Sequence, residues 1–218
     1  MILDIINEIA CDIDAEMRAA KRDQYRRHRF PVQLDWVRSL PLCPDWPPER
    51  LLAYAQRRPK FCVADIIEDG LNGEITLQDA VWFVLQPGPL QDTELRPFVI
   101  ATAETAIGYI GAYLTRNCTP VILPSPLISD WRYAELALHT LAREYSLGVL
   151  GRRNEAGAQL IARASRICGM LAQWADDDRS KKLAIRVSKL AAEISCSAYS
   201  GVATEFRRQL LHLHALVT

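Results

Sequence analysis

Hydrophobic residues recur at intervals of three and four along most of the chain, which is the spacing of one face of an α-helix. The pattern is clearest from residue 130 onward, where four such stretches follow one another with hardly any signal for a strand. They predict helices over 130–147, 154–174, 180–200 and 204–216. We expect Ser129 to cap the first of these helices and Gly148 to end it.

A different pattern covers residues 95–116, where apolar residues occupy nearly every side of the predicted helix. A helix that is apolar all round is a buried one, so we expect it at the centre of the fold. Gly108 and Gly111 lie within it, and a glycine weakens a helix by about 0.5–1 kcal/mol relative to alanine. We therefore predict that another backbone approaches closely at these glycines.

The N-terminal part contains shorter elements. A stripe of isoleucines predicts a helix that ends just before Pro31, and five of the chain's twelve prolines follow between Pro31 and Pro48. Further helices are expected over 34–39, 47–58, 60–71 and 77–86. Residues 117–129 contain three prolines and predict an extended segment or a short lone strand.

Together these elements predict an all-α fold, a compact bundle of eight or nine helices around the helix at about 95–116. We expect one domain over residues 1–218. A subdivision into an N-terminal half, 1–117, and a C-terminal four-helix half, 129–218, is the alternative.

The composition indicates a cellular compartment but no particular chemistry. Half of the 218 residues are hydrophobic, and 26 basic residues balance 26 acidic ones, so nothing draws the whole chain toward nucleic acid or anionic lipid. The first residues lack the basic region of an export signal, and the longest apolar run, 98–114, contains Glu104 and has the minimum length of a membrane span. Six cysteines without a CxxC pair indicate reduced thiols. We therefore expect a cytoplasmic protein without membrane contact.

The segment from Glu68 to Asp79 resembles the calcium loop of the EF-hand family, with Gly73 at the position of the turn glycine. It departs from that pattern because Gly70 offers no side chain at a ligand position and because the last ligand would be Asp rather than Glu. A tight turn followed by a helix that Thr76 caps explains the same residues, and we favour this interpretation.

A basic run with an interleaved aromatic residue near the end of the first predicted helix suits RNA or single-stranded DNA, because bases stack on rings and cations neutralise phosphates. Cations are also favoured at a helix C-terminus without any ligand, and a solvated face is the interpretation we favour. The residues of the nucleic-acid hypothesis are Arg18, Arg22, Tyr25, Arg26 and Arg29.

Motifs for catalysis and metal binding are weak or missing. Glu135 and His139 stand four apart on one predicted helix, but a zinc site needs three or four protein ligands. Nucleophile elbows, phosphate loops and HExxH are not found in the sequence. We expect no catalytic residues, no metal and no cofactor.

Three functional hypotheses follow. The first is a non-enzymatic regulatory or binding module that acts through protein–protein contact, with a protein partner or a second copy of itself. The second is a small-molecule-binding or enzymatic helical domain with an aromatic-lined pocket. The third is nucleic-acid binding through the basic run. The residues expected to line the pocket of the second hypothesis are Trp36, Trp46, Tyr109 and Tyr113.

Overall fold

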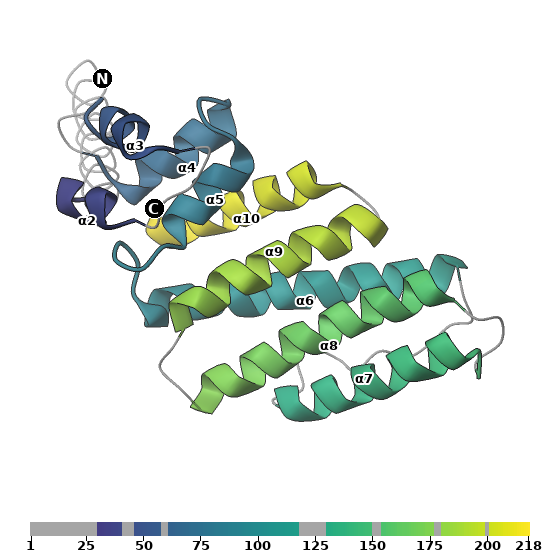
Figure 1. The fold of residues 1–218 in the computed structure, drawn as a ribbon. Coiled ribbons are helices and arrows are strands. Elements are labelled where there is room, and N and C mark those ends of the chain that lie inside the picture. The colour runs from purple at the N-terminus through teal and green to yellow at the C-terminus, as the bar shows by residue number, and fades with distance from the viewer. Residues whose placement is uncertain are drawn as a thin grey trace, which may run out of the picture.

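The computed structural model describes residues 30–40, 46–57, 61–117, 130–149, 154–176, 180–198 and 201–218. This part of the chain folds into nine α-helices, and its only β-pairings are two isolated bridges. The all-α prediction is confirmed (Figure 1). The helices are α2 (Leu34–Ser39), α3 (Pro48–Ala55), α4 (Val63–Asn72), α5 (Leu77–Val84), α6 (Asp92–Asn117), α7 (Trp131–Leu147), α8 (Glu155–Asp176), α9 (Ser180–Ala198) and α10 (Val202–Val217).

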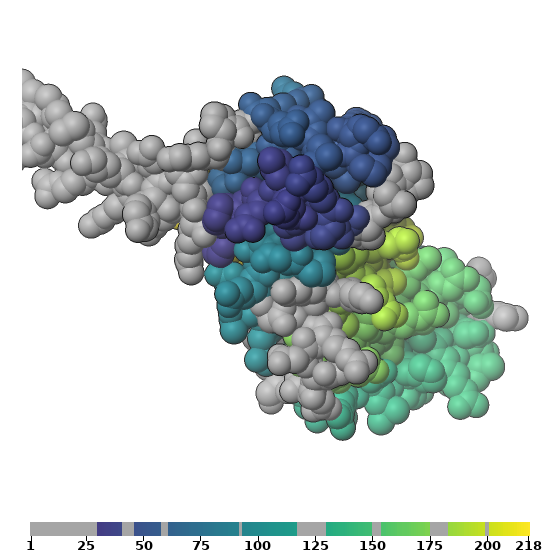
Figure 2. All heavy atoms as spheres, turned by 60° about the vertical axis from the view of Figure 1, so that its left-hand side comes forward, coloured from purple at the N-terminus to yellow at the C-terminus, as the bar shows by residue number. Residues whose placement is uncertain are grey.

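The long helices lie side by side, and the short ones gather at one end. In Figure 1, α7 forms the outer edge next to α8, and α9 and α6 follow on the other side of α8. The last helix, α10, contacts α9 and also α4 and α5, so the C-terminus of the chain packs against its N-terminal helices. Figure 2 shows the same arrangement on the surface, with α2 and α3 at the top and α7 and α8 at the lower right.

The core helix is α6. Its buried side includes Phe98, Ala106 and Ile110, none of which is exposed, and it packs against α8, α9 and α10. The expectation of burial on nearly every side is only half right, because Gly108 and Ala112 face outward and are exposed. Small residues on that side make the helix apolar in composition without requiring a neighbour.

One helix in the described residues, Thr93–Arg116, is long and apolar enough to cross a membrane by length and composition. Of its most apolar window, 44% is buried inside the protein. The core helix of a helical bundle has the same composition, and here α6 is that core helix.

Close helix packing occurs at a glycine other than the predicted ones. At Gly108 an added Cβ would meet no atom within 4 Å, so the prediction of a close approach there is wrong. At Gly70, in α4, an added Cβ would lie 2.4 Å from Ala80 Cβ and 3.0 Å from Leu210 Cδ1. Because these neighbours belong to α5 and α10, Gly70 is the point where three helices meet.

The turn between α4 and α5 is formed by a C-cap at Gly73 and an N-cap at Thr76. Gly73 ends α4 in the left-handed region, with φ 85°. The hydroxyl of Thr76 accepts a hydrogen bond from the Asp79 backbone N–H at 3.1 Å and donates to the Asp79 carboxylate at 2.7 Å. Glu68 lies instead near His214, with 4.0 Å between Oε1 and Nε2. The turn-and-cap interpretation is therefore confirmed, and these side chains are held by partners within the chain.

The predicted helix ends of α7 are correct to within one residue. The cap is Asp130 rather than Ser129, because the Asp130 carboxylate accepts hydrogen bonds from the backbone N–H groups of Arg132 and Tyr133 at 3.0 and 3.1 Å. Gly148 ends the helix with φ 75°. Both ends of α7 are therefore capped, which stabilises the helix.

Candidate functional site

The outer face of α7 carries an exposed apolar stripe. In the described residues, four of the seven large apolar side chains that are exposed lie on α7 or directly after it. They are Tyr133 (60% exposed), Leu136 (66%), Leu147 (65%) and Val149 (68%).

This stripe lies opposite the face that α7 already buries. Ala134, Leu138 and Tyr145 face the core, and α7 makes its main contacts with α8 alone. The stripe runs through positions 133, 136, 140, 143 and 147, a spacing of three and four that keeps side chains in line along a helix. The edge helix therefore carries large apolar side chains on two faces, and only those of the inner face are covered in the part of the chain that the structure describes. We call Tyr133, Leu136, Thr140, Arg143 and Leu147 the α7 seam.

A buried carboxylate organises the opposite part of the core. Glu205, in α10, is fully buried. Arg208 donates to it through Nε at 3.0 Å and Nη2 at 2.7 Å, Gln209 through Nε2 at 2.9 Å, and Tyr109 of α6 through its hydroxyl at 3.1 Å. The Ser188 hydroxyl of α9 then donates to Gln209 Oε1 at 2.5 Å. Through these contacts Glu205 joins α6, α9 and α10.

Two cysteines of the core, Cys62 and Cys168, have raised pKa values. Burial, followed by the hydrogen bond to the Asp65 carboxylate, raises the pKa of Cys62 to about 11. Burial and the charge of Glu135 raise the pKa of Cys168 to about 12. Thiols with such pKa values are almost entirely protonated at neutral pH and are poor nucleophiles. Of the cysteines within the described residues, Cys196 is the exposed one.

Metal ligands do not converge in the described part of the chain, where no three His, Cys, Asp or Glu side chains could hold one ion. Glu135 and His139, which the sequence places one helical turn apart, are both exposed on α7.

Burial and the nearby Arg208 charge lower the pKa of His212, whose ring lies 5.9 Å from that of Phe98.

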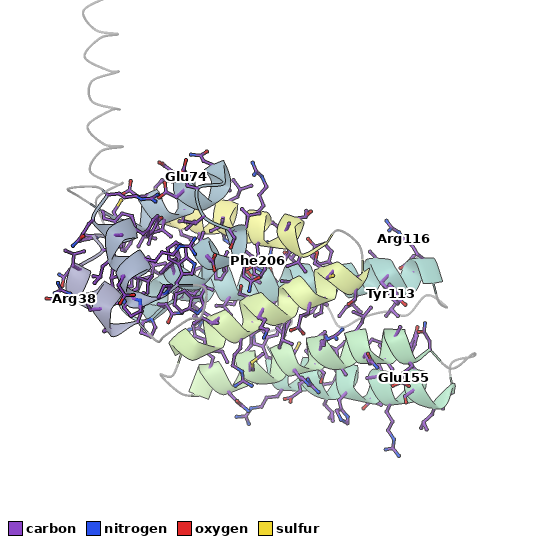
Figure 3. All side chains as sticks on the ribbon, turned by 45° about the horizontal axis from the view of Figure 1, so that its top comes forward. Arg38, Glu74, Tyr113, Arg116, Glu155 and Phe206 are labelled. Atoms are coloured by element: carbon purple, nitrogen blue, oxygen red, sulfur yellow. The ribbon has the colours of Figure 1, made fainter. Side chains whose placement is uncertain are left out.

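The four aromatic residues of the pocket hypothesis lie in different places. Trp46 is buried, with its ring 5.1 Å from that of Phe83, and Trp36 donates to the Pro87 carbonyl. Tyr109 belongs to the Glu205 network. Figure 3 shows Tyr113 near one end of the molecule and the helix of Trp36, marked by Arg38, at the other. Within the described residues, these four side chains do not form one pocket.

The basic run of the nucleic-acid hypothesis lies outside the described residues. Arg18, Arg22, Tyr25, Arg26 and Arg29 therefore remain a sequence prediction.

Comparisons with protein-family models, with curated proteins and with solved structures found no match for this chain. The functional argument therefore depends on the residues described above.

The α7 seam was missed in the sequence because Leu138 and its neighbours already accounted for one apolar face. The signal that reveals it is a second line of large apolar residues, out of phase with the first on the same helix.

Proposed function

We propose that this protein is a non-enzymatic helical module that acts through protein–protein contact, with a second copy of the chain as its partner. The observation that carries the proposal is the α7 seam, a line of exposed side chains on a capped edge helix. Large apolar side chains that gather on one exposed face mark interaction sites in monomeric folds. A cytoplasmic location is part of the proposal and is supported by the absence of any CxxC pair among the cysteines in the sequence.

A second copy suits the seam because both ends of the seam are apolar. Large apolar residues stand at both ends, Tyr133 and Leu136 at one and Leu147 at the other, with Thr140 and Arg143 between them. An antiparallel pair of α7 helices related by a two-fold axis at Thr140 places Tyr133 of each copy opposite Leu147 of the other. This is the self-complementarity that a two-fold interface requires.

The strength of the dimer follows from the size of the surface. One helix face buries less than the roughly 1,200 Å² at which stable interfaces begin, so we expect a weak, concentration-dependent dimer. A carboxylate placed at an apolar end of such a seam would be desolvated without a partner and would prevent association.

We therefore expect Tyr133→Glu to abolish self-association, because the pairing places the new carboxylate opposite Leu147 of the other copy. The measurement is light scattering coupled to size exclusion at two protein concentrations. The matched control is Leu211→Glu, which places the same charge on α10 at a residue that is 52% exposed and outside the seam.

In this experiment the unsubstituted chain and the Leu211→Glu chain should both show an average mass that rises with concentration, while Tyr133→Glu stays monomeric. A wild-type chain that is monomeric at both concentrations would contradict a second copy as the partner. Equal loss of association in both variants would show that the effect comes from net charge rather than from the seam.

A further inference from the structure

A cavity lies between α5, α9 and α10. Its volume is ≈150 Å³. Figure 3 shows the position of Phe206, one of its lining residues, where α10 runs alongside α9. The lining residues are Gln78, Asp79, Val81, Trp82, Leu85, Ile185, Ser188, Lys189 and Phe206.

The body of the cavity is apolar and suited to one ring. Trp82 and Phe206 supply aromatic surface, and Val81, Leu85 and Ile185 supply aliphatic surface. An engineered protein cavity of about the same size, 150 Å³, binds benzene. An occupant of this cavity therefore contains about one six-membered ring.

The polar groups of the cavity differ in whether they already have partners. Ser188 donates its hydroxyl hydrogen to Gln209 Oε1, so this hydroxyl has no hydrogen left to donate to a ligand. The Asp79 carboxylate accepts a hydrogen bond from Thr76 at 2.7 Å and lies in the first turn of α5, where the helix dipole favours a negative charge. Lys189 is exposed and is the one cationic side chain among the residues that line the cavity. A bound anion would therefore pair with Lys189.

We infer that this cavity binds a small monocyclic aromatic carboxylate, with the ring against Trp82 and Phe206 and the carboxylate on Lys189. Most of the contact area is apolar and one polar group sets the orientation, which is the usual composition of a small-molecule site. The inference does not depend on the α7 seam, because the cavity and the seam lie on different helices.

The test is calorimetric titration of the full chain with phenylacetate as the probe, and with phenylacetamide as its uncharged isostere. We expect saturable binding of phenylacetate with a Kd below about 1 mM. An exposed ion pair contributes little, so phenylacetamide should bind about two- to fivefold more weakly. Lys189→Gln should weaken phenylacetate binding by the same factor. Arg186→Gln is the matched control, because Arg186 is an exposed base of α9 that does not line this cavity.

A second variant tests the cavity itself. Ile185→Phe fills the space from a half-buried position, and it should remove binding while leaving the helical circular dichroism unchanged. No saturable heat at concentrations well above about 1 mM would overturn the inference. Binding of equal strength in Ile185→Phe would overturn it as well, because the probe would then occupy another place. Neither result changes the expected mass of the dimer, so failure here is distinguishable from failure of the proposed function.

Discussion

Replacing Glu205 by alanine is expected to lower the free energy of unfolding by about 3 kcal/mol. The substitution leaves Tyr109, Arg208 and Gln209 without their common acceptor, and removing one partner from a buried ion pair costs roughly 3–5 kcal/mol. We place the effect at the lower end because the Arg208 side chain is 29% exposed and regains some contact with water. In a chain of this size the loss corresponds to a decrease in Tm on the order of 10 °C.

Urea unfolding followed by circular dichroism measures this change. The matched control is Glu193→Ala, which breaks a carboxylate–guanidinium pair with Arg163 that is longer, at 3.6 Å, and in which the Glu193 side chain is 42% exposed. Such a pair contributes less than about 1 kcal/mol. Equal midpoints for Glu205→Ala and the unsubstituted chain would show that the Glu205 network does not stabilise the packing of α6, α9 and α10.

The second large effect is expected at Gly70. A methyl group at this position would lie 2.4 Å from the Ala80 methyl group, so the α4–α5 crossing must open. Forcing an extra methyl group into a packed site costs about 1–3 kcal/mol, and this exceeds the gain of at most about 1 kcal/mol that alanine brings to a helix. Gly70→Ala should therefore destabilise the protein by on the order of 1–2 kcal/mol.

Gly108→Ala is the matched control. It is the same substitution within a helix, but here the added Cβ would have no neighbouring atom within 4 Å. It should stabilise the protein by about 0.5–1 kcal/mol through helix propensity alone. Opposite shifts in the urea midpoint are the expected result. Shifts of the same sign in both variants would contradict the close packing of α4, α5 and α10 at Gly70.

The helices could be predicted from the sequence because their signals are local. The hydrophobic period placed α7, α8 and α9 correctly to within two residues at each end, and the apolar stripe of α8 that produces the period, Leu160, Ala164, Ile167 and Leu171, is buried. Capping chemistry at Thr76 and Gly148 is equally local, because the donors and acceptors lie within a few residues of one another.

Contacts between distant segments could not be predicted from such local signals. A glycine in a helix indicates either a close approach or a tolerated weak point, and the sequence does not distinguish Gly70 from Gly108. A glutamate on an amphipathic helix is normally exposed, but Glu205 is buried because Tyr109, 96 residues earlier, meets it in the fold.

The candidate surface shows the same limit. The apolar positions of the α7 seam are visible in the sequence, but their exposure follows from the place of α7 at the edge of the helix layer. The cavity beside Phe206 could not be predicted, because its walls come from α5, α9 and α10.

The most direct test of the proposed dimer is disulfide cross-linking at its symmetry axis. Thr140 is exposed at the middle of the α7 seam, so a Thr140→Cys side chain would face its own copy across the axis. A Tyr133→Cys side chain would stand about 20 Å from its own copy along the helix, given a rise of 1.5 Å per residue. After mild oxidation, non-reducing electrophoresis should show more covalent dimer for Thr140→Cys than for Tyr133→Cys or for the unsubstituted chain. Equal amounts of covalent dimer in all three would contradict an antiparallel pairing of α7.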